Sequence, residues 1–124
     1  WLCELTNAIR AVLPKNEGYI ISHAPQAPYL GSIYEYKEIH ESCGDNIDFY
    51  NVQFYNQGNE LYNTYQNMYV SYMDWATDSH INAWKDTVGL NKIVIGKCTR
   101  NGGCGDPIHE MTGNDIADII QIAI

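Results

Sequence analysis

The chain has 124 residues, and its 45% hydrophobic content is enough to form the buried core of one ordinary globular domain. Fifteen acidic residues against seven basic ones give a formal net charge of -8, without any cluster of lysine and arginine, which argues against a nucleic-acid partner. No apolar run approaches the roughly 20 residues that cross a bilayer, and no signal-peptide pattern is present. We therefore expect a globular chain that binds neither nucleic acid nor membrane.

Aromatic residues and cysteines are the informative part of the composition. Ten tyrosines and three tryptophans stand against two phenylalanines, and such side chains serve both sugar-binding clefts and barrel cores. The four cysteines are compatible with two disulfides and with secretion, and Cys98 and Cys104 could close a short loop. A zinc site would recruit His109, but the spacing of this cysteine pair is unusual for zinc and no fourth ligand stands nearby. We predict no metal site and no cofactor.

The first third of the chain predicts a helix, a strand and a second helix. Residues 1–13 place apolar side chains on one stripe of an amphipathic helix, which we expect to pack against another part of the protein, and Pro14 ends the pattern. Residues 18–24, GYIISHA, predict a strand that is buried on both faces, followed by a loop over 24–28. Residues 34–42 predict a short helix that ends at the turn residues 43–46.

Residues 47–56, IDFYNVQFYN, predict a strand whose two faces differ. The apolar face carries Tyr50, Val52 and Phe54, whereas Phe49, Asn51, Gln53 and Tyr55 share the other face. The two amides and the phenol are suited to binding a polar ligand. The alternative is an ordinary solvent-exposed strand face, on which the same residue types are common.

The remaining chain adds one more strand between two helices. After a loop at 57–59, the tyrosine-rich residues 61–73 carry no clear pattern, and residues 79–88 predict a helix capped by Asp78 or Ser79 and stopped by Gly89. Residues 91–97, NKIVIGK, predict a strand. Residues 99–107 contain too many glycine and proline breaks for regular structure, and residues 114–124 predict a closing helix.

This alternation predicts an α/β fold with a parallel sheet in a single unit, residues 1–124. Parallel folds place ligand sites at the carboxyl ends of their strands. Residues 24–26, then Gln53, Tyr55 and Asn56, and finally residues 98–99 occupy such ends. We expect them to meet at one edge of the sheet.

Three phrases carry a resemblance to a known family: ISHAPQAPYL at 21–30, IDFYNVQFYNQGN at 47–59 and NKIVIGK at 91–97. Together they resemble the fifth, sixth and seventh strands of a family 18 glycoside hydrolase of the class III chitinase type found in plants and fungi. That family is a (β/α)8 TIM barrel of about 250 residues. The resemblance therefore implies a carboxyl-side fragment of a catalytic barrel, about three βα units, whose partner is the remaining part of the barrel.

The resemblance also implies a reaction and roles for particular residues. Chitinases of this family hydrolyse β-1,4 bonds between N-acetylglucosamine units with retention, by attack of the substrate's own acetamide. Tyr55 matches the catalytic tyrosine that holds this acetamide, and Gln53 matches a glutamine that contacts the sugar. Asn56 completes the motif, and Gln26 borders the cleft or is an ordinary loop amide. His23 is interpreted as a core histidine with satisfied hydrogen bonds.

Two features depart from the family. Its acidic signature, D-x-x-D-x-D-x-E, does not occur in these 124 residues and would lie just before the first helix, so the piece alone is expected to be inactive. After Gly96 the chain has Lys97, Cys98 and Thr99 instead of the usual proline and small residue, which suggests a remodelled or disulfide-pinned rim.

Two alternatives to a chitinase that acts on chitin or chitooligosaccharides stay open from the sequence. One is a non-catalytic chitin-binding or storage protein on the same barrel. The other is a structural, self-assembling α/β protein, because unpaired strand edges invite pairing with another chain. The resemblance and the cysteine count predict an extracellular, secreted protein.

Overall fold

A parallel three-stranded sheet forms the centre of the computed structural model, which describes residues 1–31, 35–57, 62–70, 79–99 and 103–123. Its strands are β1 (Ser22–His23), β2 (Phe49–Gln53) and β3 (Ile93–Gly96), in the order β1-β2-β3. Ser22 lies opposite Phe49, and Tyr50 lies opposite Ile93. The predicted α/β class with parallel strands is confirmed, and the described strands do not close into a barrel.

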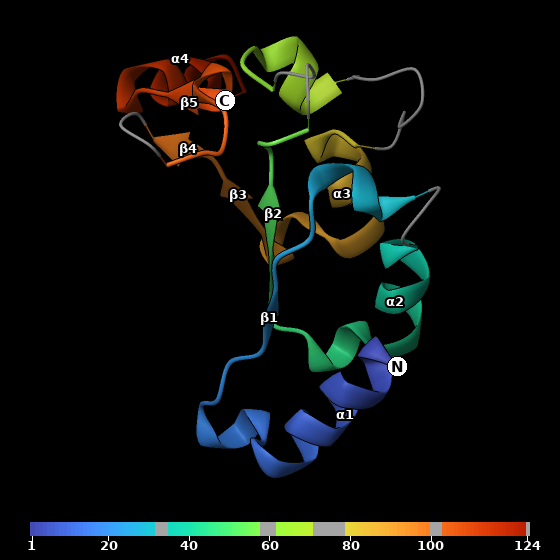
Figure 1. Cartoon of the computed structure of the whole chain (residues 1–124). Helices are drawn as coiled ribbons and strands as arrows, with labels where there is room; N and C mark the ends of the chain where they lie inside the picture. Colours follow the sequence, from blue (N-terminus) through green and yellow to red (C-terminus); the bar gives the residue numbers. More distant parts are fainter. Residues whose placement is uncertain (32–34, 58–61, 71–78, 100–102, 124) are drawn as a thin grey trace.

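Three helices lie on one side of this sheet (Figure 1). They are α1 (Leu2–Val12), α2 (Tyr36–Cys43) and α3 (Ile81–Val88). The core between the helices and the sheet is strongly aromatic: Tyr50 and Trp84 are fully buried with ring centroids 6.0 Å apart, and Trp84 donates its indole N–H to the Ala27 carbonyl at 3.0 Å. Short 3-10 turns link these elements, at Lys15–Glu17, Ala27–Leu30, Gly44–Asn46, Leu90–Lys92 and Pro107–His109.

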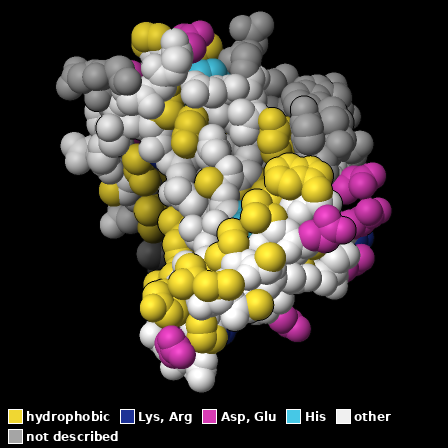
Figure 2. Space-filling view, turned by 60° about the horizontal axis from the view of Figure 1, so that its bottom comes forward, with side chains coloured by type: hydrophobic (Ala, Val, Ile, Leu, Met, Phe, Trp, Pro, Cys, Tyr) yellow, Lys and Arg dark blue, Asp and Glu magenta, His cyan; other side chains and the backbone are white. Residues whose placement is uncertain are grey.

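Helix α1 has the predicted extent but not the expected orientation. Its buried residues are Thr6 and Arg10, whereas Leu5, Ile9 and Val12 are 47%, 38% and 77% exposed. Figure 2 shows the resulting band of apolar side chains across the face of the molecule on which α1 lies. The helix turns this way because the guanidinium of Arg10 finds several acceptors at the base of the sheet. The apolar stripe is therefore left uncovered by the described residues.

Strand β1 is shorter and more exposed than the sequence predicted. Regular pairing extends only over Ser22–His23 instead of residues 18–24, and Tyr19 and Ile20 are 45% and 69% exposed. The expectation of burial on both faces is wrong because β1 is an edge strand in this sheet, with β2 as its described neighbour, and because α1–α3 cover a single face.

The N-cap of helix α3 lies one residue after Ser79 and two residues after Asp78, the two predicted caps. His80 is the N-cap, and its Nδ1 accepts a hydrogen bond from the Ala83 amide at 3.1 Å. Asp78 lies outside the described residues. Gly89 ends the helix as predicted, with a φ of 86° that an L side chain rarely adopts.

Strands β4 and β5 and helix α4, within residues 98–123, form a small unit beyond the ends of the central strands (Figure 1). Strand β4 (Cys98–Thr99) pairs in parallel with β5 (Glu110–Met111), so part of the stretch expected to be irregular joins a sheet. Helix α4 (Gly113–Ala123) follows, and a reciprocal cap stabilises its start: the Asp115 amide donates to Thr112 Oγ1 at 3.1 Å while the Thr112 amide donates to the Asp115 carboxylate at 2.7 Å. In the tyrosine-rich stretch, a π-helix spans Gln66–Val70; residues 61 and 71–73 lie outside the described residues.

Two disulfides join the four cysteines. Cys3 on α1 is bonded to Cys43 at the end of α2, and Cys98 is bonded to Cys104, which closes the short loop that the sequence suggested. Among the described residues, no helix is long and apolar enough to cross a membrane. The same part of the chain holds no group of three or more histidine, cysteine, aspartate or glutamate side chains arranged to hold a metal ion.

Candidate functional site

Two of the three predicted strand ends, residues 24–26 and Gln53, meet at one edge of the sheet, whereas residues 98–99 pair with β5 in a separate two-stranded sheet. The backbone N–H of Gln53, the last residue of β2, donates to the Pro25 carbonyl in the segment after β1 at 2.8 Å. A bridge also joins Gln53 to Gln26. On the other side, the Phe54 amide donates to the Gly96 carbonyl at the end of β3 at 3.0 Å. The carboxyl ends of all three strands therefore lie side by side.

The two faces of β2 alternate as predicted. Tyr50, Val52 and Phe54 are fully buried under the helices. On the opposite face Asn51 is exposed and Gln53 is half-buried, and Val94 of the neighbouring strand is 46% exposed. Since α1–α3 cover only the other side of the sheet, the described residues leave this face open along β2 as far as the Gln53–Tyr55 end.

The side chain of Gln53 is held in place. Its Nε2 donates to the Ala24 carbonyl at 2.6 Å, and its own backbone carbonyl accepts a hydrogen bond from Gln57 Nε2 at 3.1 Å. A fixed amide can serve as a directional hydrogen-bonding group for a polar ligand. Gln26 is half-buried beside it, so the structure brings these two predicted site residues together.

A bend directly after β2 places Tyr55 and Asn56. Tyr55 is half-buried and Asn56 is exposed. Asn56 has a φ of 62°, in the left-handed region that asparagine tolerates better than most residues, and this conformation turns the chain away from the strand direction. A Cβ added to Gly105 would lie 3.9 Å from Asn56 Oδ1, so the segment after the Cys98–Cys104 loop lies against the bend.

Lys97 supports the same bend from the end of β3. Its ammonium donates to the Phe54 carbonyl at 2.8 Å and to the Tyr62 carbonyl at 3.0 Å. Burial lowers the pKa of Lys97 to about 8, which still leaves the side chain mostly protonated at pH 7. The sequence marked this position as a departure from the family but gave it no role; a lysine directly after an apolar strand was the available signal.

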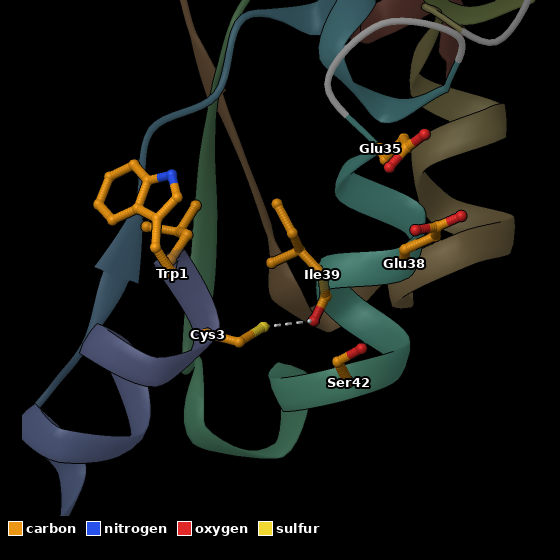
Figure 3. Close-up of a pocket in the computed structure, with 7 residues that line it drawn as sticks. Trp1, Cys3, Glu35, Glu38, Ile39 and Ser42 are labelled. Atoms are coloured by element: carbon orange, nitrogen blue, oxygen red, sulfur yellow. Dashed lines mark hydrogen bonds between the residues drawn. The ribbon is translucent and has the colours of Figure 1, made fainter.

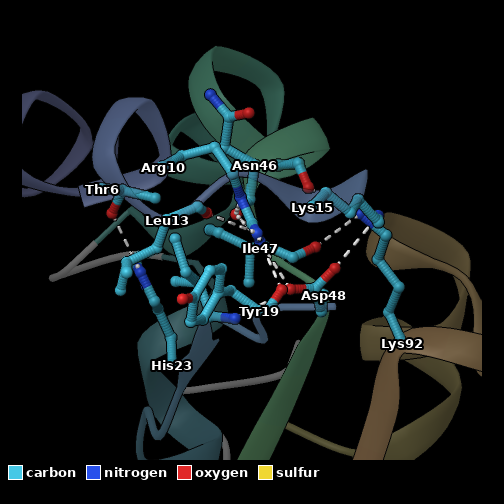
Figure 4. A network of polar contacts seen from close by, with 12 residues as sticks. Thr6, Arg10, Leu13, Lys15, Tyr19, His23, Asn46, Ile47, Asp48 and Lys92 are labelled. Atoms are coloured by element: carbon cyan, nitrogen blue, oxygen red, sulfur yellow. Dashed lines mark hydrogen bonds and ion pairs between the residues drawn. The ribbon is translucent and has the colours of Figure 1, made fainter. Parts of the chain in front are cut away.

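A polar network occupies the opposite, amino end of the strands (Figure 4). Arg10 donates to the carbonyls of Asn46, Leu13 and Tyr19 and forms an ion pair with Asp48. Lys15 lies 3.0 Å from the other Asp48 oxygen. Because these carboxylate contacts are at the far end of β2 from Gln53, the network stabilises the fold and does not form part of the candidate site.

His23 is half-buried and has a polar partner near each ring nitrogen, so it is the hydrogen-bonded histidine that the sequence indicated but not a fully buried one. Its Nε2 lies 3.0 Å from Thr6 Oγ1 and its Nδ1 lies 3.5 Å from the Tyr36 hydroxyl. Burial lowers the pKa of the imidazole, so the neutral form is favoured. The ring therefore packs between α1 and α2 and does not face the open side of the sheet.

A pocket of about 280 Å³ lies between α1 and α2 (Figure 3). Trp1, Cys3, Glu35, Glu38 and Ile39 are among its lining residues, and the Cys3 sulfur lies 3.5 Å from the Ile39 carbonyl oxygen. The neighbouring Glu35 carboxylate raises the pKa of Glu38. This pocket is on the helical side, remote from Gln53 and Tyr55, and we assign it no function.

Comparison with known proteins adds a solved structure to this geometry. No protein-family model matches the sequence, and no curated protein matches it. The chain is similar to the crystal structure of a GH18 chitinase from Pseudoalteromonas aurantia, with 30% sequence identity and a TM-score of 0.73. The match covers 98% of this chain and 43% of the chitinase, so the chain spans less than half the length of that protein. The similarity supports the resemblance to family 18 glycoside hydrolases.

Proposed function

We propose that this chain is the carboxyl-side part of a family 18 chitinase, strands five to seven of a barrel of the class III type, and that the whole protein hydrolyses β-1,4 bonds between N-acetylglucosamine units. The observation that carries the proposal is the open strand end at Gln53 and Tyr55, in a chain that matches a GH18 chitinase over 98% of its length. An extracellular location is consistent with its two disulfides.

Each residue of the strand end has a distinct part in this proposal. The hydroxyl of Tyr55 hydrogen-bonds the acetamide of the substrate and holds its oxygen in line with the anomeric carbon, the kind of positioning that lowers a barrier by several kcal/mol. Gln53, fixed by its bond to Ala24, contacts a sugar hydroxyl. Asn56 sets the bend that directs Tyr55, and Gln26 borders the cleft.

The proton donor belongs to a different segment of the protein. In the substrate-assisted scheme a glutamic acid protonates the leaving oxygen, and an aspartate orients the acetamide and stabilises its developing positive charge. Asp48 directly precedes β2, at the opposite end of the strand from Tyr55, and its carboxylate is paired with Arg10 and Lys15. It is therefore not placed to act as the proton donor. The acid and its aspartate neighbour therefore come from the strand that precedes α1 in the proposed barrel.

The rest of the barrel is the proposed partner of the exposed apolar surface. Leu5, Ile9 and Val12 of α1 and Ile20 beside β1 form this α1 face, which the described residues leave open. Helices of this type normally bury such a stripe against strands of their own sheet. Because the match covers only 43% of the chitinase, we infer that the amino-side part of the barrel, outside these residues, covers the α1 face.

The proposal is tested on the longer protein that contains these residues. We expect D-x-x-D-x-D-x-E about 10 to 25 residues before Trp1, a distance that fits neighbouring βα elements. We also expect hydrolysis of chitotetraose, with no activity from residues 1–124 alone. A glutamine, leucine or asparagine at the acid position, together with chitooligosaccharide binding, would favour a chitin-binding protein instead. If the folded protein shows no chitooligosaccharide binding and no hydrolysis, the chitinase and the chitin-binding proposals are both refuted, and a structural role is favoured.

A further inference from the structure

We propose that Lys97 is a positioning residue for the sugar-binding bend: its ammonium fixes the backbone on both sides of Tyr55 by binding the Phe54 and Tyr62 carbonyls. This inference rests on the proposed function for its catalytic consequence. Its structural part, the restraint of the bend, stands apart from that function. No contact between Lys97 and a substrate is required.

The contacts of Lys97 are placed where they control Tyr55. The Phe54 carbonyl belongs to the peptide bond that leads into Tyr55, and it accepts from Lys97 Nζ at 2.8 Å. The Tyr62 carbonyl, which accepts at 3.0 Å, belongs to a residue after the bend in the sequence. One side chain therefore joins a residue before the bend and a residue after it to the end of β3.

Other hydrogen bonds restrain the residues on either side of Phe54, and Lys97 is the donor to the Phe54 carbonyl oxygen. The Phe54 amide is bonded to Gly96 and the Gln53 carbonyl is bonded to Gln57, so the strand is fixed up to residue 54. Asn56 then holds a left-handed conformation, which costs free energy for a residue with a side chain and persists where surrounding contacts enforce it. Lys97 supplies one such enforcing contact immediately before the bend.

Burial makes the hydrogen bonds from Lys97 to the two carbonyls costly to lose. Phe54 and Tyr62 are fully buried, with ring centroids 5.2 Å apart, so their backbone carbonyls have little access to water. Hydrogen bonds from a charged donor are stronger than those from a neutral one, and a buried carbonyl that loses its donor is costly to leave unpaired. Removal of the ammonium should therefore shift the bend instead of leaving it in place.

The test compares Lys97→Met with Lys97→Arg and with Lys85→Met in the longer protein. Methionine keeps the length of the side chain and removes the charge, arginine keeps the charge and the donors, and Lys85 is a 44% exposed lysine on α3 that serves as the matched control. Two quantities are measured: steady-state kcat and KM on chitotetraose, and amide hydrogen exchange of peptides covering 53–57 and 81–88.

For Lys97→Met we expect faster exchange in 53–57 but not in 81–88, and a loss of roughly 10- to 100-fold in kcat with KM changed less than about threefold, since a misplacement near 1 Å has this scale of effect. Lys97→Arg should restore most of the protection, and Lys85→Met should match the wild type. Unchanged exchange in 53–57 would overturn the proposal, as would equally faster exchange in both peptides or an arginine variant that behaves like methionine. Local exchange changes in a protein without chitinase activity would refute the proposed function while supporting the positioning role.

Discussion

Replacing Asp48 with asparagine tests whether the network at the amino end of the sheet stabilises the fold. The Asp48 carboxylate accepts from the Ile21 amide at 2.8 Å and pairs with Arg10 and Lys15. Burial alone would raise its pKa, but these hydrogen bonds and charges outweigh burial and lower the pKa from 3.8 to about 2. A shift of that size corresponds to about 2 kcal/mol, or about 1 to 2 kcal/mol after allowance for solvent screening.

The substitution also leaves Arg10 without its counter-charge. Arg10 is 8% exposed, and it keeps its bonds to the Asn46, Leu13 and Tyr19 carbonyls. We therefore expect Asp48→Asn to lower the free energy of unfolding at pH 7 by about 2 to 3 kcal/mol, less than the 3 to 5 kcal/mol typical of a buried pair broken completely. Urea unfolding followed by circular dichroism measures this difference. Asp86→Asn is the control, because its 74% exposed side chain pairs only loosely with Lys85, and it should change stability by less than about 0.5 kcal/mol.

The pH dependence of this difference has a defined sign. The folded-state pKa of Asp48 lies below its unfolded value, so the charged form stabilises the folded state above pH 3.8, and this contribution is lost as the pH falls through 3.8 toward 2. The stability gap between wild type and Asp48→Asn should therefore be constant above about pH 5 and shrink below pH 4. A gap that stays the same from pH 7 to pH 2.5, or one smaller than that of the Asp86 control, would refute this reasoning.

Two further predictions concern the disulfides and the α1 face. Replacing the Cys3–Cys43 pair with serine should cost about 4 kcal/mol and replacing the Cys98–Cys104 pair about 2 kcal/mol in the chain-entropy treatment, because the bridges close loops of 40 and 6 residues; equal losses in thermal or urea unfolding would contradict the loop-length argument. We expect residues 1–124 alone to self-associate through the exposed α1 face. Ile9→Gln combined with Val12→Gln should weaken this association in sedimentation velocity and leave the stability within about 0.5 kcal/mol, since both side chains are exposed. Association that is unaffected by these substitutions would exclude the α1 face as its cause.

The central strand was predictable because its two faces differ in chemistry. Alternation with a period of two placed Tyr50, Val52 and Phe54 in the core, and burial under one layer of helices follows directly. The order of strands and helices likewise predicted parallel pairing, which brought Gln53 and Gln26 together at one edge. These inferences depend on local pattern and on chain order, both of which a sequence carries.

The errors arise where a specific polar group overrides the pattern. The apolar stripe of α1 predicted a buried face, but Arg10 has several N–H donors that require acceptors, and the carbonyls at the base of the sheet supply them. His80 caps α3 although histidine is not a preferred N-cap residue. The pairing of β4 with β5 joins two-residue strands, which are too short to show a periodicity.

The role of Tyr55 in hydrolysis tests the account most directly. Tyr55→Phe in the longer protein removes one hydroxyl from the bend and leaves the ring, while steady-state kinetics on chitotetraose separate turnover from binding. We predict that kcat falls roughly 10- to 100-fold and that KM changes less than about threefold, because the hydroxyl orients the acetamide for attack. Turnover equal to that of the wild type would contradict the assignment of this strand end as part of a chitinase active site.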